Sequence, residues 1–241
     1  MQTTKKKKSS LITLLVVGSV CFSCAMDTVT GQTVKEERKL PAFQAIDLSM
    51  SAEVYLSQGD PQSVQIEADK TSLEYIETEV NGNSLVVKTT DGHWRNLGKV
   101  KVFITVPEIN RMGLSGSGNV VSQTPIRSGD MHIEISGSGN VKITTLEAPK
   151  ISVKITGSGN VTLAGTNDQA QLDATITGSG SMKADELSVG SAGITITGSG
   201  SARVNVLKEL ETNITGSGNV QYKGNPMINA RSTGSGKTTA L

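Results

Sequence analysis

The sequence predicts an all-β protein built mainly as a right-handed parallel β-helix, a β-solenoid with about 20 residues per coil. Three observations predict this fold: a Gly-Ser-Gly motif that recurs seven times, apolar residues that alternate on both sides of the motif, and few aromatic residues. With 3% aromatic residues and 26 glycines among 241 residues, a compact core of Phe and Trp is not expected. Ile, Val, Leu and Ala supply the core instead.

The first residues have the pattern of an export signal. Lys5 to Lys8 form a basic stretch, and Leu11 to Val20 form an apolar stretch that is too short for a permanent membrane span. Residues 1–23 are therefore interpreted as a lipoprotein signal peptide. Its removal leaves 19 basic and 22 acidic residues, a formal net charge of −3. This balance gives no electrostatic reason to expect nucleic-acid binding.

The two cysteines of the chain, Cys21 and Cys24, stand at the end of the apolar stretch. In a bacterial lipoprotein signal, a small residue precedes the cysteine that receives lipid. Because Ser23 precedes Cys24, we predict lipid attachment at Cys24, with Cys21 as the alternative. Ordinary secretion with cleavage near Ala25 is the other reading. Residues 24–37 are expected to form a polar tether, and the mature domain cannot be a disulfide-stapled scaffold.

Residues 38–112 differ from the rest of the chain. They contain short strand-like runs separated by turn signals such as Asn81-Gly82-Asn83, and Glu67 to Ile76 could hold a short helical turn. This N-terminal β region forms either the first coils, without the Gly-Ser-Gly edge, or a separate β subdomain that caps the stack. Some cap is expected, because an open solenoid end exposes strand edges.

Residues 113–241 contain the repeats. The seven motifs begin at Gly116, Gly137, Gly157, Gly178, Gly198, Gly216 and Gly234, in steps of 21, 20, 21, 20, 18 and 18 residues. Apolar residues at every second position flank each motif, which indicates strands with one inward face. Each repeat is therefore expected to contain a strand, a glycine turn, a second strand and a looser return.

Gly-rich turns between alternating strands also occur in antiparallel sandwiches, but seven nearly identical turns at one period favour stacking. In a stack, coils lie about 4.8 Å apart and glycine accepts positive φ where backbones approach closely. Asn119, Asn140, Asn160 and Asn219 follow the motif and are expected to form an amide ladder. Ser or Thr precedes every motif and predicts a second, hydroxyl row.

The N-terminal region and the repeats together resemble the head GIN domain family of bacterial proteins, also called auto-transporter adhesins. The resemblance covers the chain from about residue 40 onwards. It is seen in Phe43-Gln44-Ala45-Ile46, Ala52-Glu53-Val54-Tyr55-Leu56, Gln58-Gly59, Leu85-Val86-Val87, Val102-Phe103-Ile104-Thr105-Val106-Pro107 and the serial Gly-Ser-Gly motifs. It implies a β-solenoid and export, often with a lipoprotein signal, and it brings no catalytic residues.

Residues for catalysis are few. The chain has two histidines far apart in sequence, no aspartate recurs in register as calcium-binding β-rolls require, and we expect no metal, no cofactor and no catalytic residue. Ser117, His132 and Asp130 could be imagined as a triad, but nothing in the sequence brings them together. His93-Trp94-Arg95 is a candidate ligand contact, because a ring and a guanidinium can stack on a sugar or peptide. Its alternative role is a loop that folds back as a hydrophobic plug.

These observations favour a cell-envelope lipoprotein that acts as a non-catalytic, adhesin-like binding or scaffold module. The expected partners are the membrane, through the lipid anchor, and an unidentified glycan or protein ligand, with no nucleic acid. The expected location is the outer membrane, facing the periplasm or the exterior. Two alternatives stay open: a carbohydrate-active β-helix enzyme whose scattered carboxylates meet in a groove, and a surface protein that self-assembles through its flat strand edges.

Overall fold

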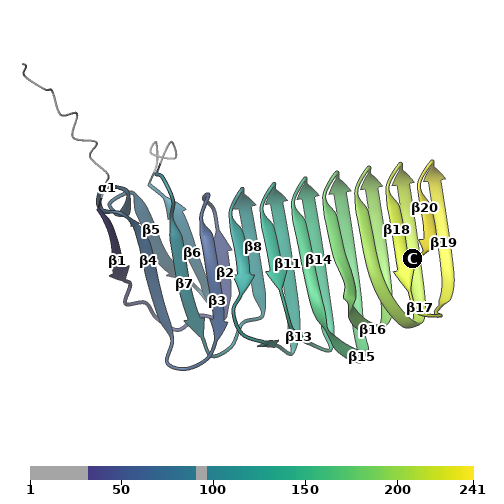
Figure 1. The fold of residues 1–241 in the computed structure, drawn as a ribbon, viewed down its shortest axis with the longest axis horizontal. Coiled ribbons are helices and arrows are strands. Elements are labelled where there is room, and N and C mark those ends of the chain that lie inside the picture. The colour runs from purple at the N-terminus through teal and green to yellow at the C-terminus, as the bar shows by residue number, and fades with distance from the viewer. Residues whose placement is uncertain (1–31, 91–96) are drawn as a thin grey trace, which may run out of the picture. The chain divides into compact units, whose positions relative to one another are not determined.

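The computed structural model describes residues 32–90 and 97–241, which belong to one compact unit (Figure 1). These residues form a β-solenoid of stacked coils with two long walls, as the repeats predict. The coils around the motifs are formed by β8 (Arg111–Gly116), β9 (Asn119–Ser122), β11 (Asp130–Gly137), β12 (Asn140–Ile143), β14 (Lys150–Gly157), β15 (Asn160–Gly178), β16 (Ser181–Gly198), β17 (Ser201–Gly216), β18 (Asn219–Lys223), β19 (Met227–Gly234) and β20 (Lys237–Ala240).

Parallel pairing stacks each Gly-Ser-Gly turn directly on the preceding one. Gly157 lies opposite Gly137 in the ladder between β14 and β11, and Gly178 lies opposite Gly157 in the next. Backbone hydrogen bonds continue through the turns, with Ser158 N donating to Gly137 O at 2.9 Å. Gly157 has a φ of +117°, which an L side chain rarely adopts. The repeat therefore requires glycine because both the backbone conformation and the close stacking demand it.

The predicted amide ladder is present where the second strand begins in three coils, but Asn219 does not join it: Asn219 lies opposite Ser201 and Lys237, and its Nδ2 donates to Ser217 O at 3.4 Å. Asn140 Nδ2 donates to Asn119 Oδ1 at 2.7 Å, and Asn160 Nδ2 donates to Asn140 Oδ1 at 2.8 Å. Ser181 Oγ extends the chain of bonds by donating to Asn160 Oδ1 at 2.6 Å. We call this side of the stack the ladder wall. It consists of β7 (Lys101–Val106), β3 (Glu53–Gln58), β9, β12, β18, β20 and the N-terminal arms of β15, β16 and β17; the other side is called the opposite wall.

The N-terminal region contributes two further coils, and their order in the stack differs from their order in the chain. Their strands are β2 (Ala45–Leu48), β3 (Glu53–Gln58), β6 (Ser84–Thr89) and β7 (Lys101–Val106). β2 pairs in parallel with both β6 and β8, and β3 pairs in parallel with both β7 and β9. The β2/β3 coil thus lies between a coil that follows it in sequence and the first Gly-Ser-Gly coil (Figure 1).

Antiparallel strands close the N-terminal end of the stack. β5 (Ile76–Asn81) pairs with β6, β4 (Ser63–Asp69) pairs with β7, and β1 (Thr33–Glu37) pairs with β4. The expected helical turn is α1 (Lys70–Leu73), which follows the N-cap residue Asp69. Part of the segment expected to be a tether, residues 24–37, is therefore a strand, because the backbone of β1 pairs with β4 and continues the antiparallel sheet.

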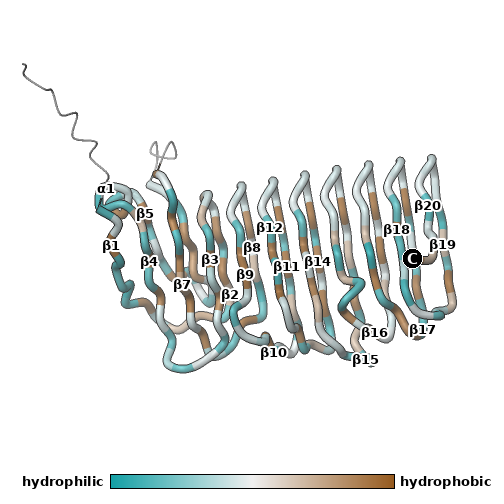
Figure 2. Tube along the Cα trace, in the orientation of Figure 1, coloured by the Kyte–Doolittle hydropathy of each residue, from teal (hydrophilic) through white to brown (hydrophobic). Residues whose placement is uncertain are grey.

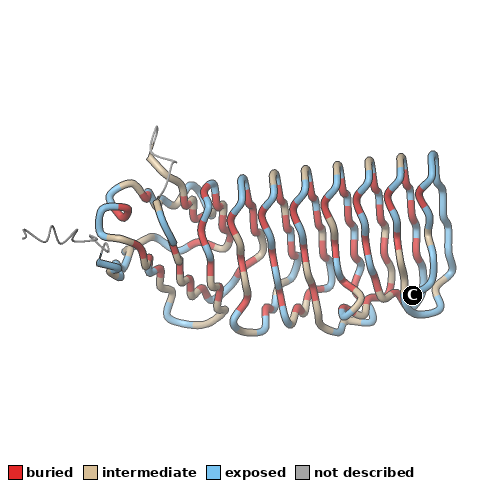
Figure 3. Tube along the Cα trace, turned by 45° about the horizontal axis from the view of Figure 1, so that its top comes forward, coloured by how far each residue is buried: buried red, intermediate tan, exposed pale blue. Residues whose placement is uncertain are grey.

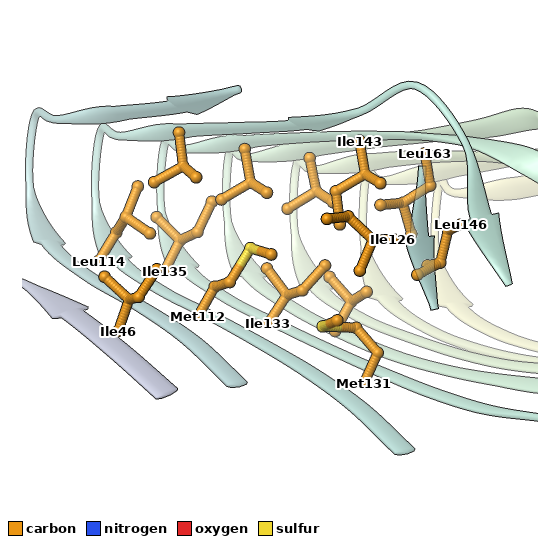
Figure 4. Packing of buried hydrophobic residues seen from close by; sticks show 14 of the residues in the cluster. Ile46, Met112, Leu114, Ile126, Met131, Ile133, Ile135, Ile143, Leu146 and Leu163 are labelled. Atoms are coloured by element: carbon orange, nitrogen blue, oxygen red, sulfur yellow. The ribbon is translucent and has the colours of Figure 1, made fainter. Parts of the chain in front are cut away.

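The interior between the walls is a continuous apolar ladder. Inward positions of successive coils lie next to one another, so that Ile135 lies opposite Leu114 (Figure 4). In the next ladder, Ile155 lies opposite Ile135. All three are buried. Hydrophobic and buried residues alternate with polar and exposed ones along the strands of every middle coil (Figures 2 and 3). Burial of these branched side chains is the main stabilising contribution in a chain with so few aromatic residues.

A short parallel ladder lies between the two walls at the edge opposite the glycine turns. It is formed by β10 (Ile126–Arg127) and β13 (Leu146–Glu147). At the C-terminal end, β19 is exposed along its whole length, and Met227 is 74% exposed. Within the described residues, β19 pairs only with β17 and β20 only with β18, so each of the two strands of the last coil leaves one edge unpaired.

Glu67 at the N-terminal end should make stability depend on acid pH. Its carboxylate accepts a hydrogen bond from Lys101 Nζ at 2.8 Å and pairs with Lys35 Nζ at 3.2 Å, and these contacts lower the pKa of Glu67. The stabilisation is present above the unfolded-state pKa, about 4.3, and is lost as pH falls through the lower folded-state pKa. Denaturant unfolding from about pH 6 to pH 2 should therefore show a smaller decline for Glu67→Gln than for wild type.

Glu37→Gln is the matched control for this measurement. It removes the same charge from β1, where Glu37 is exposed and forms no ion pair with any described residue. Its acid decline should match that of wild type. Equal slopes for wild type and Glu67→Gln would show that the contacts of Glu67 do not contribute.

A candidate binding surface on the ladder wall

An aromatic pair lies on the outer face of the ladder wall near its N-terminal end. Tyr55 of β3 lies opposite Phe103 of β7, with ring centroids 5.2 Å apart and ring planes 15° from parallel. Lys35 Nζ lies 4.9 Å from the centroid of the Phe103 ring. Tyr55 Oη donates to Glu53 Oε2 at 3.0 Å, and this bond raises the pKa of Tyr55. Both rings are half-buried, so they present a fixed apolar platform to solvent.

A shallow hollow of about 400 Å³ lies beside Tyr55 on the same wall. Its floor combines apolar groups with the amide ladder. The lining includes Tyr55, Val121, Lys142, Thr162, Asn119, Asn140 and Asn160, together with the acid Glu53, which accepts the hydrogen bond from Tyr55. Apolar ring contact next to amides and an ammonium group is a combination that can bind a sugar ring by its face and its hydroxyls.

Three cations continue the row that begins at the aromatic platform. The position three residues after each Gly-Ser-Gly motif points outward on this wall and lies opposite its equivalent in the next coil. Lys142, Lys183 and Arg203 occupy this position in three of the coils, and all three are exposed. We call these residues the cation row. Thr162 lies between Lys142 and Lys183.

A larger groove, of about 1160 Å³, runs along the edge of the stack opposite the glycine turns, where the chain passes from one wall to the other. Gln58 holds the returning segments together: its Nε2 donates to Pro107 O and Arg127 O at 3.0 Å each, and its Oε1 accepts from Arg127 N at 2.7 Å. Arg127 Nε donates to Glu147 Oε2 at 2.8 Å, which lowers the pKa of Glu147. A carboxylate held in its ionised form in this way is unsuited to the role of general acid.

His132 and Asp130 also line this groove, but Ser117 does not join them. His132 lies opposite Arg111 at the start of the ladder, whereas Ser117 belongs to the glycine turn at the other end of the strand. Six residues of extended chain from Arg111 to Ser117 span roughly 20 Å. The Ser-His-Asp arrangement is therefore not assembled. Among the residues that the structure describes, no three His, Cys, Asp or Glu side chains gather where they could hold a metal ion.

The residues selected from the sequence lie in segments that the structure does not describe. His93, Trp94 and Arg95 fall within 91–96, and Cys21 and Cys24 fall within 1–31, so their roles stay predictions. No helix in the described part of the chain is long and apolar enough to span a membrane. Sequence reasoning did not select Tyr55, Phe103 or the cation row, although aligning the repeats on their motifs shows the third position after each one.

Comparison with known proteins places this geometry in context. The family model described as "Putative auto-transporter adhesin, head GIN domain" matches residues 42–226. A crystal structure of a "putative adhesin" from Bacteroides fragilis superposes with a TM-score of 0.81 at 25% identity, over 87% of this chain and 97% of its own. The structure of a "putative lipid binding protein" from Parabacteroides distasonis superposes with a TM-score of 0.73 at 24% identity, over 88% of this chain and 98% of its own. The structure of a "putative adhesin" from Parabacteroides merdae superposes with a TM-score of 0.71 at 21% identity, over 88% of this chain and 97% of its own. No curated protein matches the chain.

Proposed function

Because the chain belongs to the head GIN domain family, described as "Putative auto-transporter adhesin", we propose that it is a non-catalytic, adhesin-like binding module of the cell envelope. The observation that supports this role is the aromatic platform of Tyr55 and Phe103, which lies half-exposed on β3 and β7, two strands that are each paired on both sides. Apolar rings on a rigid surface contribute contact area at little cost in conformational entropy. The proposed ligand is a glycan or a glycan-bearing protein, bound on the ladder wall.

Display from the membrane is the second part of the proposal. We propose export through residues 1–23 and lipid attachment at Cys24, in the outer membrane. The supporting features are the four lysines, the apolar stretch and the small residue before Cys24. Metabolic labelling with a fatty-acid precursor should tag wild type and Cys21→Ser but not Cys24→Ser. Label on Cys24→Ser would place the anchor elsewhere.

Binding by the ladder wall can be tested with immobilised glycans and mucin-type glycoproteins. Full-length protein in a neutral detergent should bind a subset of them, and Tyr55→Ala should weaken that binding at least about tenfold, since aromatic anchors in binding sites commonly contribute more than 1 kcal/mol. Loss of the ring removes the platform without changing the backbone ladder. Equilibrium binding by biolayer interferometry gives the comparison.

Thr195→Ala, an exposed position on the opposite wall, is the control and should bind as wild type does. Melting temperatures measured in parallel separate a binding defect from a folding defect. Absence of binding by wild type to every surface, or equal binding by Tyr55→Ala, would contradict the proposal.

A further inference from the structure

Charged residues that face each other across neighbouring strands follow a rule in this protein. In the ladders of the described residues, eight cross-strand pairs join two charged side chains, with His excluded. Seven of the eight join opposite charges: Lys35 with Glu67, Glu53 with Lys101, Glu67 with Lys101, Glu77 with Lys88, Arg127 with Glu147, Asp130 with Lys150 and Glu134 with Lys154. Opposite charges in such pairs stabilise a sheet, and like charges destabilise it.

The eighth pair breaks this rule and lies in the cation row. Lys183 of β16 lies directly opposite Arg203 of β17. The other cross-strand neighbours of these two residues are Thr162 and Gln221, so no acid on an adjacent strand offsets the repulsion. Arg203 Nε donates to Gln221 Oε1 at 3.0 Å, which is a hydrogen bond to a neutral group. The structure thus retains an unfavourable pair of charges at an exposed site.

The cation row also has no ion partner within residues 32–90 and 97–241. Among the residues that the structure describes, none of the ten ion pairs includes Lys142, Lys183 or Arg203. Asp185 follows Lys183 by two residues, but its carboxylate forms an ion pair with Lys223, with Nζ 3.2 Å from Oδ2. Glu186 lies just after a register shift in the ladder between β15 and β16. On the opposite wall, by contrast, Arg111 and Lys154 are both paired with acids.

The spacing of the cation row indicates the shape of an anion that would fit it. Lys142 and Arg203 are three strand separations apart, which is about 14 Å. A single sulfate or phosphate cannot contact both ends, whereas a linear chain with repeated negative groups can. Such a chain would run along the stack, across the strands. Towards the N-terminal end of the stack, the row of cross-strand neighbours that contains Lys142 continues through Val121, Tyr55 and Phe103.

We propose that the cation row binds an anionic polysaccharide, one with carboxylate or sulfate groups along its chain. The inference rests on the proposed binding function of the ladder wall and names the class of its ligand. Carboxylates or sulfates of the chain pair with Lys142, Lys183 and Arg203 and relieve the repulsion between the last two. Sugar rings further along the chain contact the aromatic platform, which an anion without apolar faces would not use.

The test compares charged and neutral forms of one polysaccharide. Full-length protein in a neutral detergent should bind dextran sulfate and not unmodified dextran, with an affinity that falls as salt rises. The variant K142Q/K183Q/R203Q should lose at least about tenfold in affinity for dextran sulfate. Dextran sulfate should also raise the melting temperature of wild type and leave that of the variant unchanged, because ligand binding to the folded state stabilises it.

The matched control is K150Q/K154Q/R231Q, which removes three exposed cations from the opposite wall and changes the net charge equally. It should bind dextran sulfate within about twofold of wild type. An equal loss in both variants would show a response to net charge alone and would overturn the proposal. Equal affinity for single-stranded DNA or for anionic phospholipid vesicles would overturn the polysaccharide class.

The outcomes also separate this inference from the broader function. If Tyr55→Ala weakens glycan binding while K142Q/K183Q/R203Q still binds dextran sulfate as wild type does, the binding module stands and the anionic class is wrong. If neither variant changes any binding, the ladder wall itself is not the binding surface.

Discussion

Gly157→Ala should destabilise the protein by more than about 2 kcal/mol, or prevent it from folding. Gly157 has a φ of +117°, and a Cβ added to it would lie 2.6 Å from the carbonyl oxygen of Gly137 in the preceding turn. Relief would require the two stacked backbones to separate, which would break the hydrogen bond from Ser158 N to Gly137 O. Urea unfolding followed by circular dichroism gives the difference in free energy.

Gly129→Ala is the control for this substitution. Gly129 lies in a return segment, its φ is not in the left-handed region, and nothing lies within 4 Å of a Cβ built on it. Its free energy of unfolding should stay within about 0.5 kcal/mol of wild type. Similar effects at both positions would mean that turn stacking does not set the requirement for glycine.

Ile155→Ala should lower the free energy of unfolding by about 2–5 kcal/mol, the usual range for truncation of a buried branched side chain. Ile155 is 0% exposed and lies between Ile135 and Ile176 of the neighbouring coils. The backbone ladders prevent the coils from moving together, so the cavity cannot close by collapse. Urea unfolding at constant pH measures the effect.

Leu207→Ala tests whether this effect comes from the interior. Leu207 is 41% exposed in β17, outside the apolar ladder, and its truncation should cost about 0.5 kcal/mol or less. A loss as large as that of Ile155→Ala would indicate that the coil itself, rather than its filled interior, limits stability.

The repeat coils could be predicted from the sequence because every level of information agreed. Glycines at 116, 137 and 157 mark a constant period, and alternation on both sides gives the inward face. The amide ladder of Asn119, Asn140 and Asn160 followed from the same alignment and is confirmed. Local signals suffice here, since each coil contacts only its neighbours.

The arrangement of the N-terminal region could not be predicted in the same way. Residues 45–58 contain alternating strands, but nothing local indicates that β2 pairs with β6 on one side and β8 on the other. The same limit applied to the candidate site. Tyr55 and Phe103 are far apart in sequence, and only pairing of β3 with β7 makes them a platform. The Lys183 and Arg203 pair becomes unusual only when the pairing of every other charge is known.

Synthesis and assembly must follow different orders in this protein, because the β2/β3 coil lies between two coils that emerge after it. Ile46 of β2 pairs with Leu85 of β6, 39 residues later in the chain, and with Met112 of β8, 66 residues later. Both pairings of β2 can therefore form only after these residues have been synthesised. Closing such long loops costs more entropy than adding a coil of 18–21 residues. Formation of the N-terminal coils is therefore expected to be the slow step, after which the repeats can add one by one as the chain emerges.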